Sequence, residues 1–167
     1  MSSLNHRLES QLKSVGQDPT LRPALAQVIK VKQTPGVTSV RVYEAALDAA
    51  RDTFAVSTPH PDLVRERALL IASAAAAETS VSLADLPAGA DKSRHCFLSA
   101  YMSLKLARIA DGVLPRALAE RVGVWGSMGI GLLKELYDMV FATGFSRADL
   151  VADLAGARLP FQAPRLG

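Results

Sequence analysis

Apolar residues recur every three or four positions along most of the chain, which is the period of an amphipathic helix. Proline and glycine interrupt the pattern at short intervals, and the segments between the interruptions predict helices at residues 3–15, 20–32, 39–54, 62–79, 91–110, 115–141 and 146–157. The chain is 49% apolar but only 5% aromatic, a composition that favours helices packed closely through small side chains. The sequence therefore predicts an all-α fold, a bundle of about seven helices.

A loop at residues 80–90 is the clearest division of the chain. Residues 1–88, before and within it, predict an N-terminal helical region without a chemical motif. Residues 89–157 predict three helices joined by short turns, and residues 158–167, which contain two prolines, predict an extended tail. Because short connections make consecutive helices antiparallel neighbours, we expect the last three helices to form one unit.

Three short segments of this unit place ionisable groups at helical spacing, and residues three or four apart lie on one helix face. At about 1.5 Å per residue, counting from the connecting turns puts the groups within roughly two turns of one another along the bundle axis. The sequence therefore predicts one shared cluster. Its acids and its histidine are Asp91 and His95 in GADKSRHC, Glu135 and Asp138 in LKELYD, and Asp149 and Asp153 in FSRADLVADLAG.

The same segments carry a resemblance to a known family. The pattern is Asp91-Lys92-x-x-His95, then Lys134-Glu135-Leu136-Tyr137-Asp138, then Ser146-x-x-Asp149-Leu150-x-x-Asp153-x-x-Gly156. In order and spacing, residues 89–157 resemble the YfiM-like family of small predicted bacterial lipoproteins, and more loosely VanZ-like proteins. The resemblance implies a helical unit with these residues at its site and a location in the cell envelope, but it implies no reaction.

The first interpretation of the cluster is non-catalytic. Its ion pairs would hold the bundle together, or would grip a small polar ligand or a protein partner. Asp91 can also cap the helix that follows Gly89, and Asp149 can complete a capping box with Ser146. Such networks are common without any function. The candidate binding residues are Lys92, Lys134, Asp138, Asp149 and Asp153.

The second interpretation is an enzyme, most simply a metal-assisted hydrolase. One imidazole and several carboxylates suit Zn, Mn or Fe. General acid–base chemistry would use His95, oriented by Asp91 and assisted by Glu135. The candidate metal ligands are His95, Glu135, Asp138 and Asp153.

Charge and length limit the partners and the location. The net charge is +3 and the basic residues are scattered, so no nucleic-acid partner is predicted, although peripheral contact with an anionic membrane remains compatible. The longest uncharged apolar run in the later helices, residues 122–133, is shorter than the roughly 20 residues of a membrane span. The chain as written shows neither an export signal nor a lipid-attachment cysteine, so we expect a soluble, cytoplasmic protein unless the family's envelope location applies. Trp125, Tyr101 and Tyr137 are interpreted as core or rim residues.

Overall fold

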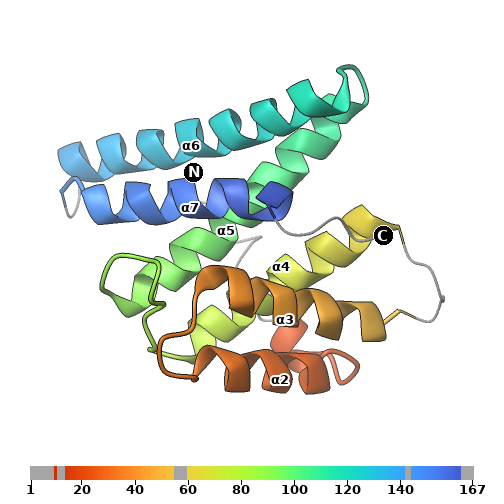
Figure 1. Cartoon of the computed structure of the whole chain (residues 1–167). Coiled ribbons are helices and arrows are strands. Elements are labelled where there is room, and N and C mark those ends of the chain that lie inside the picture. The colour runs from red at the N-terminus through yellow and green to blue at the C-terminus, as the bar shows by residue number, and fades with distance from the viewer. Residues whose placement is uncertain (1–9, 11–13, 55–59, 142–143, 163–167) are drawn as a thin grey trace.

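The computed structural model of the chain describes residue 10 and residues 14–54, 60–141 and 144–162. The fold is all-helical, as predicted, and the described residues contain no strand. The first of the seven helices is described only at Ser10 and residues 14–17. The other six, shown in Figure 1, are α2 (Arg22–Lys32), α3 (Ser39–Asp52), α4 (Pro61–Glu78), α5 (Ala90–Asp111), α6 (Arg116–Phe141) and α7 (Arg147–Gln162).

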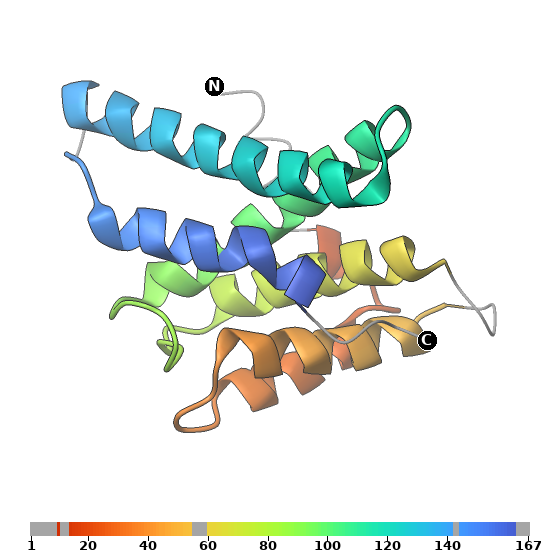
Figure 2. The same cartoon turned by 45° about the horizontal axis from the view of Figure 1, so that its top comes forward.

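The helices form two layers that share α5. Helices α2, α3 and α4 pack against one another in one layer, and α6 and α7 lie side by side in the other (Figures 1 and 2). α5 contacts α4 on one side and both α6 and α7 on the other. α5 is therefore the central helix, and both groups of helices are positioned against it.

One hydrophobic core crosses the predicted division of the chain. Val28, Tyr43 and Leu69 of the N-terminal layer and Phe97 and Leu104 of α5 are all fully buried in the same cluster. α5 carries Ala100 and Ala107 among its buried positions, and such small side chains let neighbouring helices approach closely. Residues before and after the loop at 80–90 therefore share a core.

Lys32 is a buried cation in this N-terminal layer. Its Nζ donates hydrogen bonds to the carbonyl oxygens of Thr79 and Val81, at 3.2 and 2.7 Å, and to the hydroxyl of Thr79 at 2.6 Å. These carbonyls follow the end of α4, where backbone acceptors have no partner within the helix. Lys32 thus joins the end of α2 to the end of α4, a role that the helical period did not indicate.

The end of α7 differs from the prediction. An extended tail was predicted from Arg158, but α7 continues to Gln162 with Pro160 inside its last turn; residues 163–167 lie outside the described part. Leu159 and Pro160 are both buried. Their burial against the core favours the extra turn despite the helix-breaking tendency of proline.

Every helix in the described part of the chain is too short or too polar to span a lipid bilayer.

Candidate functional site

Glycine and serine bring α5, α6 and α7 unusually close together. A β-carbon on Gly123 of α6 would lie 2.4 Å from the carbonyl oxygen of Ser103 in α5, so only glycine fits there. One turn further along α6, Ser127 Oγ donates to the carbonyl of Ser99 at 2.9 Å. The hydroxyl of Ser103 donates to the carbonyl of Ala157 in α7 at 2.8 Å. The glycines of α6 thus permit the close contact that places three helices around one charged cluster.

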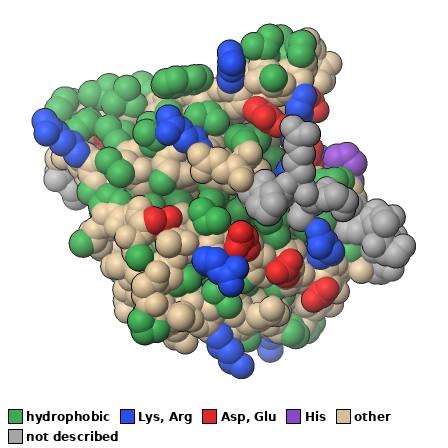
Figure 3. All heavy atoms as spheres, viewed as in Figure 1, with side chains coloured by type: hydrophobic (Ala, Val, Ile, Leu, Met, Phe, Trp, Pro, Cys, Tyr) green, Lys and Arg blue, Asp and Glu red, His purple; other side chains and the backbone are tan. Residues whose placement is uncertain are grey.

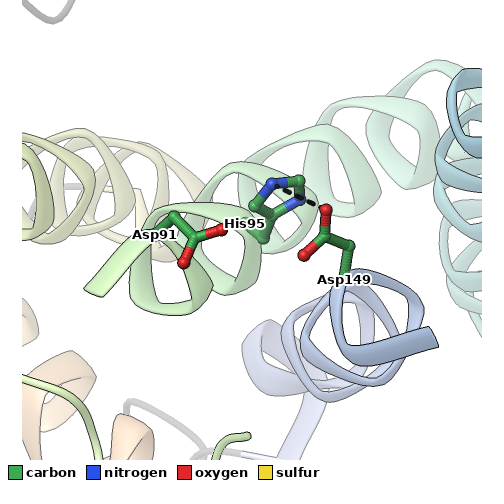
Figure 4. Close-up of side chains that lie close together, drawn as sticks. All are labelled: Asp91, His95 and Asp149. Carbon is green, nitrogen blue, oxygen red and sulfur yellow. Dashed lines mark ion pairs between the residues drawn. The ribbon is translucent and has the colours of Figure 1, made fainter. Parts of the chain in front are cut away.

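His95 lies between two carboxylates of α7. Its Nε2 is 3.5 Å from Asp149 Oδ2, and its Nδ1 is 3.4 Å from Asp153 Oδ1. Figure 4 shows His95 and Asp149 facing each other from α5 and α7. The hydrogen bond with Asp153 raises the pKa of His95, against the opposing effects of burial and of Lys134. Because both ring nitrogens face a carboxylate, the arrangement favours the imidazolium, in which both nitrogens are donors.

Lys92 occupies the space between Asp91 and Asp149. Its Nζ donates to Asp91 Oδ2 at 2.6 Å and also to Asp149 Oδ1. The bond from Lys92 is the main cause that lowers the pKa of Asp91. Burial opposes ionisation of both Asp149 and Lys92, yet their mutual bond and neighbouring charges lower the pKa of Asp149 and raise that of Lys92. The two acids therefore already have a cation between them.

Glu135 forms the second half of the cluster, where α6 meets the start of α7. Its side chain is only 1% exposed, and its Oε2 accepts the backbone N–H of Ser146 at 2.8 Å. Lys134 Nζ bonds to Glu135 Oε1 at 3.0 Å and to Asp138 Oδ2 at 2.8 Å. Glu135 therefore caps α7 from a neighbouring helix, where orphan N–H groups favour a negative charge.

The capping roles predicted for Asp91 and Asp149 are only partly found. Gly89 stands at the N-cap of α5 with φ 136°, and Asp91 lies in the first turn with its carboxylate on Lys92. The N–H of Asp149 does bond to Ser146 Oγ at 3.2 Å. The carboxylate of Asp149, however, points to Lys92 and His95 and leaves the N–H of Ser146 to Glu135.

A histidine–aspartate cluster is confirmed. Asp149 and Asp153 contact His95 directly, and Lys92 joins Asp91 to Asp149. Glu135 and Asp138 form a separate group around Lys134. Gly131 lies against Asp153, since a β-carbon on it would be 2.6 Å from Asp153 Oδ2, and this contact places the α6 groups beside those of α5 and α7.

Metal-ligand spacing occurs at a different set of residues from the predicted one. Among the described residues, Asp91, His95 and Asp149 offer ligand atoms within 4.8 Å of one another, and they include only His95 of the four predicted ligands. The fit to a divalent ion is poor, because Lys92 already pairs with two of these carboxylates, Asp91 and Asp149. Asp138 and Glu135 instead bind Lys134.

The outward face of α6 is the feature that sequence reasoning missed. Eleven large apolar side chains on this one helix are between 42% and 71% exposed. Of its six charged residues Arg121 is exposed, Glu135 is buried, and the other four are partly exposed and form ion pairs. In the space-filling view, hydrophobic side chains gather along the upper edge of the molecule, over α6 (Figure 3). We call this surface the α6 face. It consists of Leu118, Val122, Trp125, Ile130, Leu132, Leu133, Leu136, Tyr137, Met139, Val140 and Phe141.

Trp125 and Tyr137 therefore lie on the surface and outside the core. Their exposed fractions are 71% and 52%. A signal was present in the sequence, because the apolar residues of α6 occupy more of its circumference than a single core-facing stripe requires. The inner side of α6 is instead made of small and charged residues, including Gly123, Ser127 and Glu135. The large apolar residues that recur along α6 therefore lie on its outer side.

Comparison of the chain with protein families, curated proteins and solved structures finds no match. The resemblance of residues 89–157 to the YfiM-like family accordingly stays a prediction, and the local geometry is the basis for a functional conclusion.

Proposed function

We propose that this chain is a non-catalytic helical binding protein, in which the charged cluster holds α5, α6 and α7 together and a partner binds to the α6 face. The single observation that carries the proposal is the exposure of eleven large apolar side chains on one helix. Scattered apolar residues are normal on a protein surface, whereas a continuous patch of this size is typical of an interaction site.

The cluster supports this division of roles because its charges are satisfied internally. Lys92 and His95 neutralise Asp149, His95 also contacts Asp153, and Lys134 pairs with Glu135. A group that serves as a general base or as a metal ligand must have a free lone pair. His95 lies between two carboxylates, with Nε2 facing Asp149 and Nδ1 facing Asp153, and this position supports a structural role.

The accessibility of Trp125 tests the proposal. Trp125 is the only tryptophan of the chain, so its fluorescence reports on the α6 face alone. In dilute solution we expect long-wavelength emission that acrylamide quenches efficiently, and binding of a hydrophobic dye that falls when Leu133 and Leu136 are replaced by lysine. A blue-shifted, unquenched Trp125 in the dilute monomer would mean that the chain itself covers the face, and would refute the proposal.

A second candidate, the metal-assisted hydrolase, rests on the spacing of Asp91, His95 and Asp149. A bound ion would have to displace Lys92 from the two carboxylates and compete with protons for the imidazole of His95. Lys92→Met removes the competing cation, so this variant is the most favourable form for metal binding. Stoichiometric Zn or Mn after purification, with a melting temperature that falls on addition of a chelator, would support the metal site. Absence of bound metal in both the native chain and Lys92→Met would eliminate it.

A further inference from the structure

The α6 face contains a regular seam at its centre. Seven exposed residues follow one another at alternating intervals of four and three positions: Leu118, Val122, Trp125, Gly129, Leu132, Leu136 and Met139. This is the spacing at which one helix presents a continuous apolar seam to another helix in a coiled coil. A seam of this kind can pack against the side chains of a partner helix. The residue at its centre, however, is a glycine, which needs a separate explanation.

Gly129 is not required by packing against the helices that the structure describes. A β-carbon on Gly129 would meet nothing within 4 Å, whereas β-carbons on Gly123, Gly126 and Gly131 would each meet a neighbouring helix at less than 3 Å. An exposed glycine inside a helix costs about 0.8–1 kcal/mol relative to alanine. Packing of α5 and α7 compensates for the other three glycines but not for Gly129. The missing side chain is explained if a bulky group from outside occupies that space.

The seam matches itself when it is reversed. In an antiparallel pair of α6 helices whose two-fold axis lies at the level of residue 127, Trp125 of each copy is level with Gly129 of the other. Val122 is then level with Leu132, and Leu118 with Leu136, because the members of each pair are equally distant from residue 127. The largest side chain of the seam thus stands opposite the position that has no side chain, and apolar residues face apolar residues elsewhere.

The available area is also sufficient for a stable dimer. From their exposed fractions, the eleven side chains of the α6 face present on the order of 1,000 Å², compared with about 800 Å² per partner in a standard interface. Five of the eleven lie beside the seam, so an interface of this size also includes residues that flank it: Ile130, Leu133, Tyr137, Val140 and Phe141. A helix that lies on an anionic membrane usually carries several lysines or arginines beside its apolar side. On α6, Arg121 is exposed, and the side chains of Arg116 and Lys134 are 37% and 41% exposed but are already paired with carboxylates of this chain. The area and the internal pairing of these cations favour a protein helix as the occupant.

Building on the proposed function, we propose that the partner of the α6 face is a second copy of this chain, bound through an antiparallel contact between the two α6 helices in which Trp125 of each copy packs over Gly129 of the other. The contact is isologous, which is the commonest symmetry of soluble oligomers. It removes Trp125 from water and fills the space left by Gly129.

Sedimentation equilibrium and Trp125 emission from about 1 µM to about 500 µM test the proposal. The mass should double as concentration rises, and the emission should shift to shorter wavelength over the same range. Leu132→Glu should weaken association by about 100-fold or more, because it buries an unpaired charge at the seam. Leu63→Glu is the matched control, since Leu63 of α4 is equally exposed at 44% but lies outside the α6 face, and it should leave association unchanged.

Gly129→Leu separates association from folding. The monomer has room for the new side chain and gains helix propensity, so its melting temperature should rise while association is lost. A mixture of the Trp125→Cys and Gly129→Cys variants should form a disulfide between copies under oxidation, which neither variant forms efficiently alone. A monomeric mass at the highest concentration, or a dimer insensitive to both Leu132→Glu and Gly129→Leu, would overturn the second-copy proposal.

Vesicles of phosphatidylcholine and phosphatidylserine distinguish the second-copy proposal from the proposed function. If the chain stays monomeric but Trp125 shifts to shorter wavelength on these vesicles, the second-copy proposal fails while the α6 face remains a binding surface. If Trp125 is already protected in the dilute monomer, both fail.

Discussion

Gly156 of α7 lies so close to Cys96 of α5 that a β-carbon on the glycine would stand 1.9 Å from the carbonyl oxygen of Cys96. The two backbones are therefore in direct contact at this point. Cys96 follows His95 in α5, and Gly156 lies three residues after Asp153 in α7. The closest approach of the two helices thus stands beside the contact between His95 and Asp153, and it sets the distance across which the charged cluster forms.

Replacement of Gly156 by alanine should separate α5 from α7. The added methyl group meets backbone that cannot rotate away, so we expect the free energy of unfolding to fall by about 3 kcal/mol or more, measured by urea denaturation. Gly129→Ala is the control, because its β-carbon meets nothing within 4 Å and its helix propensity should raise monomer stability by about 0.5–1 kcal/mol. Equal effects of the two substitutions would contradict the close packing of α5 and α7.

Stability should depend on pH through His95. The contacts with Asp149 and Asp153 outweigh burial and the charge of Lys134, so the pKa of His95 in the folded state lies above its ordinary value of 6.5. A raised pKa adds stability that is complete below 6.5 and is lost as pH rises through the folded-state pKa. The melting temperature should therefore fall as the pH rises above 6.5.

The variant His95→Gln tests whether His95 causes this dependence of the melting temperature on pH. It keeps a polar side chain but does not titrate, so its melting temperature should change less over the same pH range. A slope identical to that of the native chain would show that another group is responsible.

Removal of the Glu135 carboxylate should weaken the junction between α6 and α7. Glu135→Ala leaves the N–H of Ser146 and the ammonium of Lys134 without this acceptor, and we expect a loss of about 2–3 kcal/mol in the free energy of unfolding. Glu120→Ala is the matched control on the same helix, because Glu120 is paired with Arg116 near the surface and should cost less than about 1 kcal/mol. Comparable losses would argue against the capping role of Glu135.

Substitution of Lys32 should destabilise the N-terminal layer and leave the charged cluster intact. Lys32→Met retains most of the volume but leaves the carbonyls of Thr79 and Val81 without their donor, so we expect a loss of about 3 kcal/mol. Lys30→Met removes an exposed lysine from the same helix and should change stability by less than about 0.5 kcal/mol. Thermal melting compares the two variants. A melting temperature of Lys32→Met equal to that of Lys30→Met would contradict the buried, hydrogen-bonded position of Lys32.

Helix positions and the polar cluster follow largely from the sequence. The apolar period, together with proline and glycine at the turns, locates α2 to α6 to within about two residues. The spacing of Asp91, His95, Asp149 and Asp153 also places them correctly along the helix axes, because rise per residue is a constant of the helix. Counting residues from the turns is therefore enough to predict that these groups converge.

Only the tertiary structure decided how each helix is rotated and which charges pair. The position of a residue along the helix axis does not determine which side of α6 faces α5. In the structure the small residues Gly123 and Ser127 face α5, and the large apolar residues face outward. Backbone contact through glycine leaves no space for large side chains between the helices, so the larger residues of α6 face outward. The same contact lets Lys92 lie between Asp91 and Asp149. The pairing of charges depends on distances of a few ångströms, which residue spacing alone does not determine.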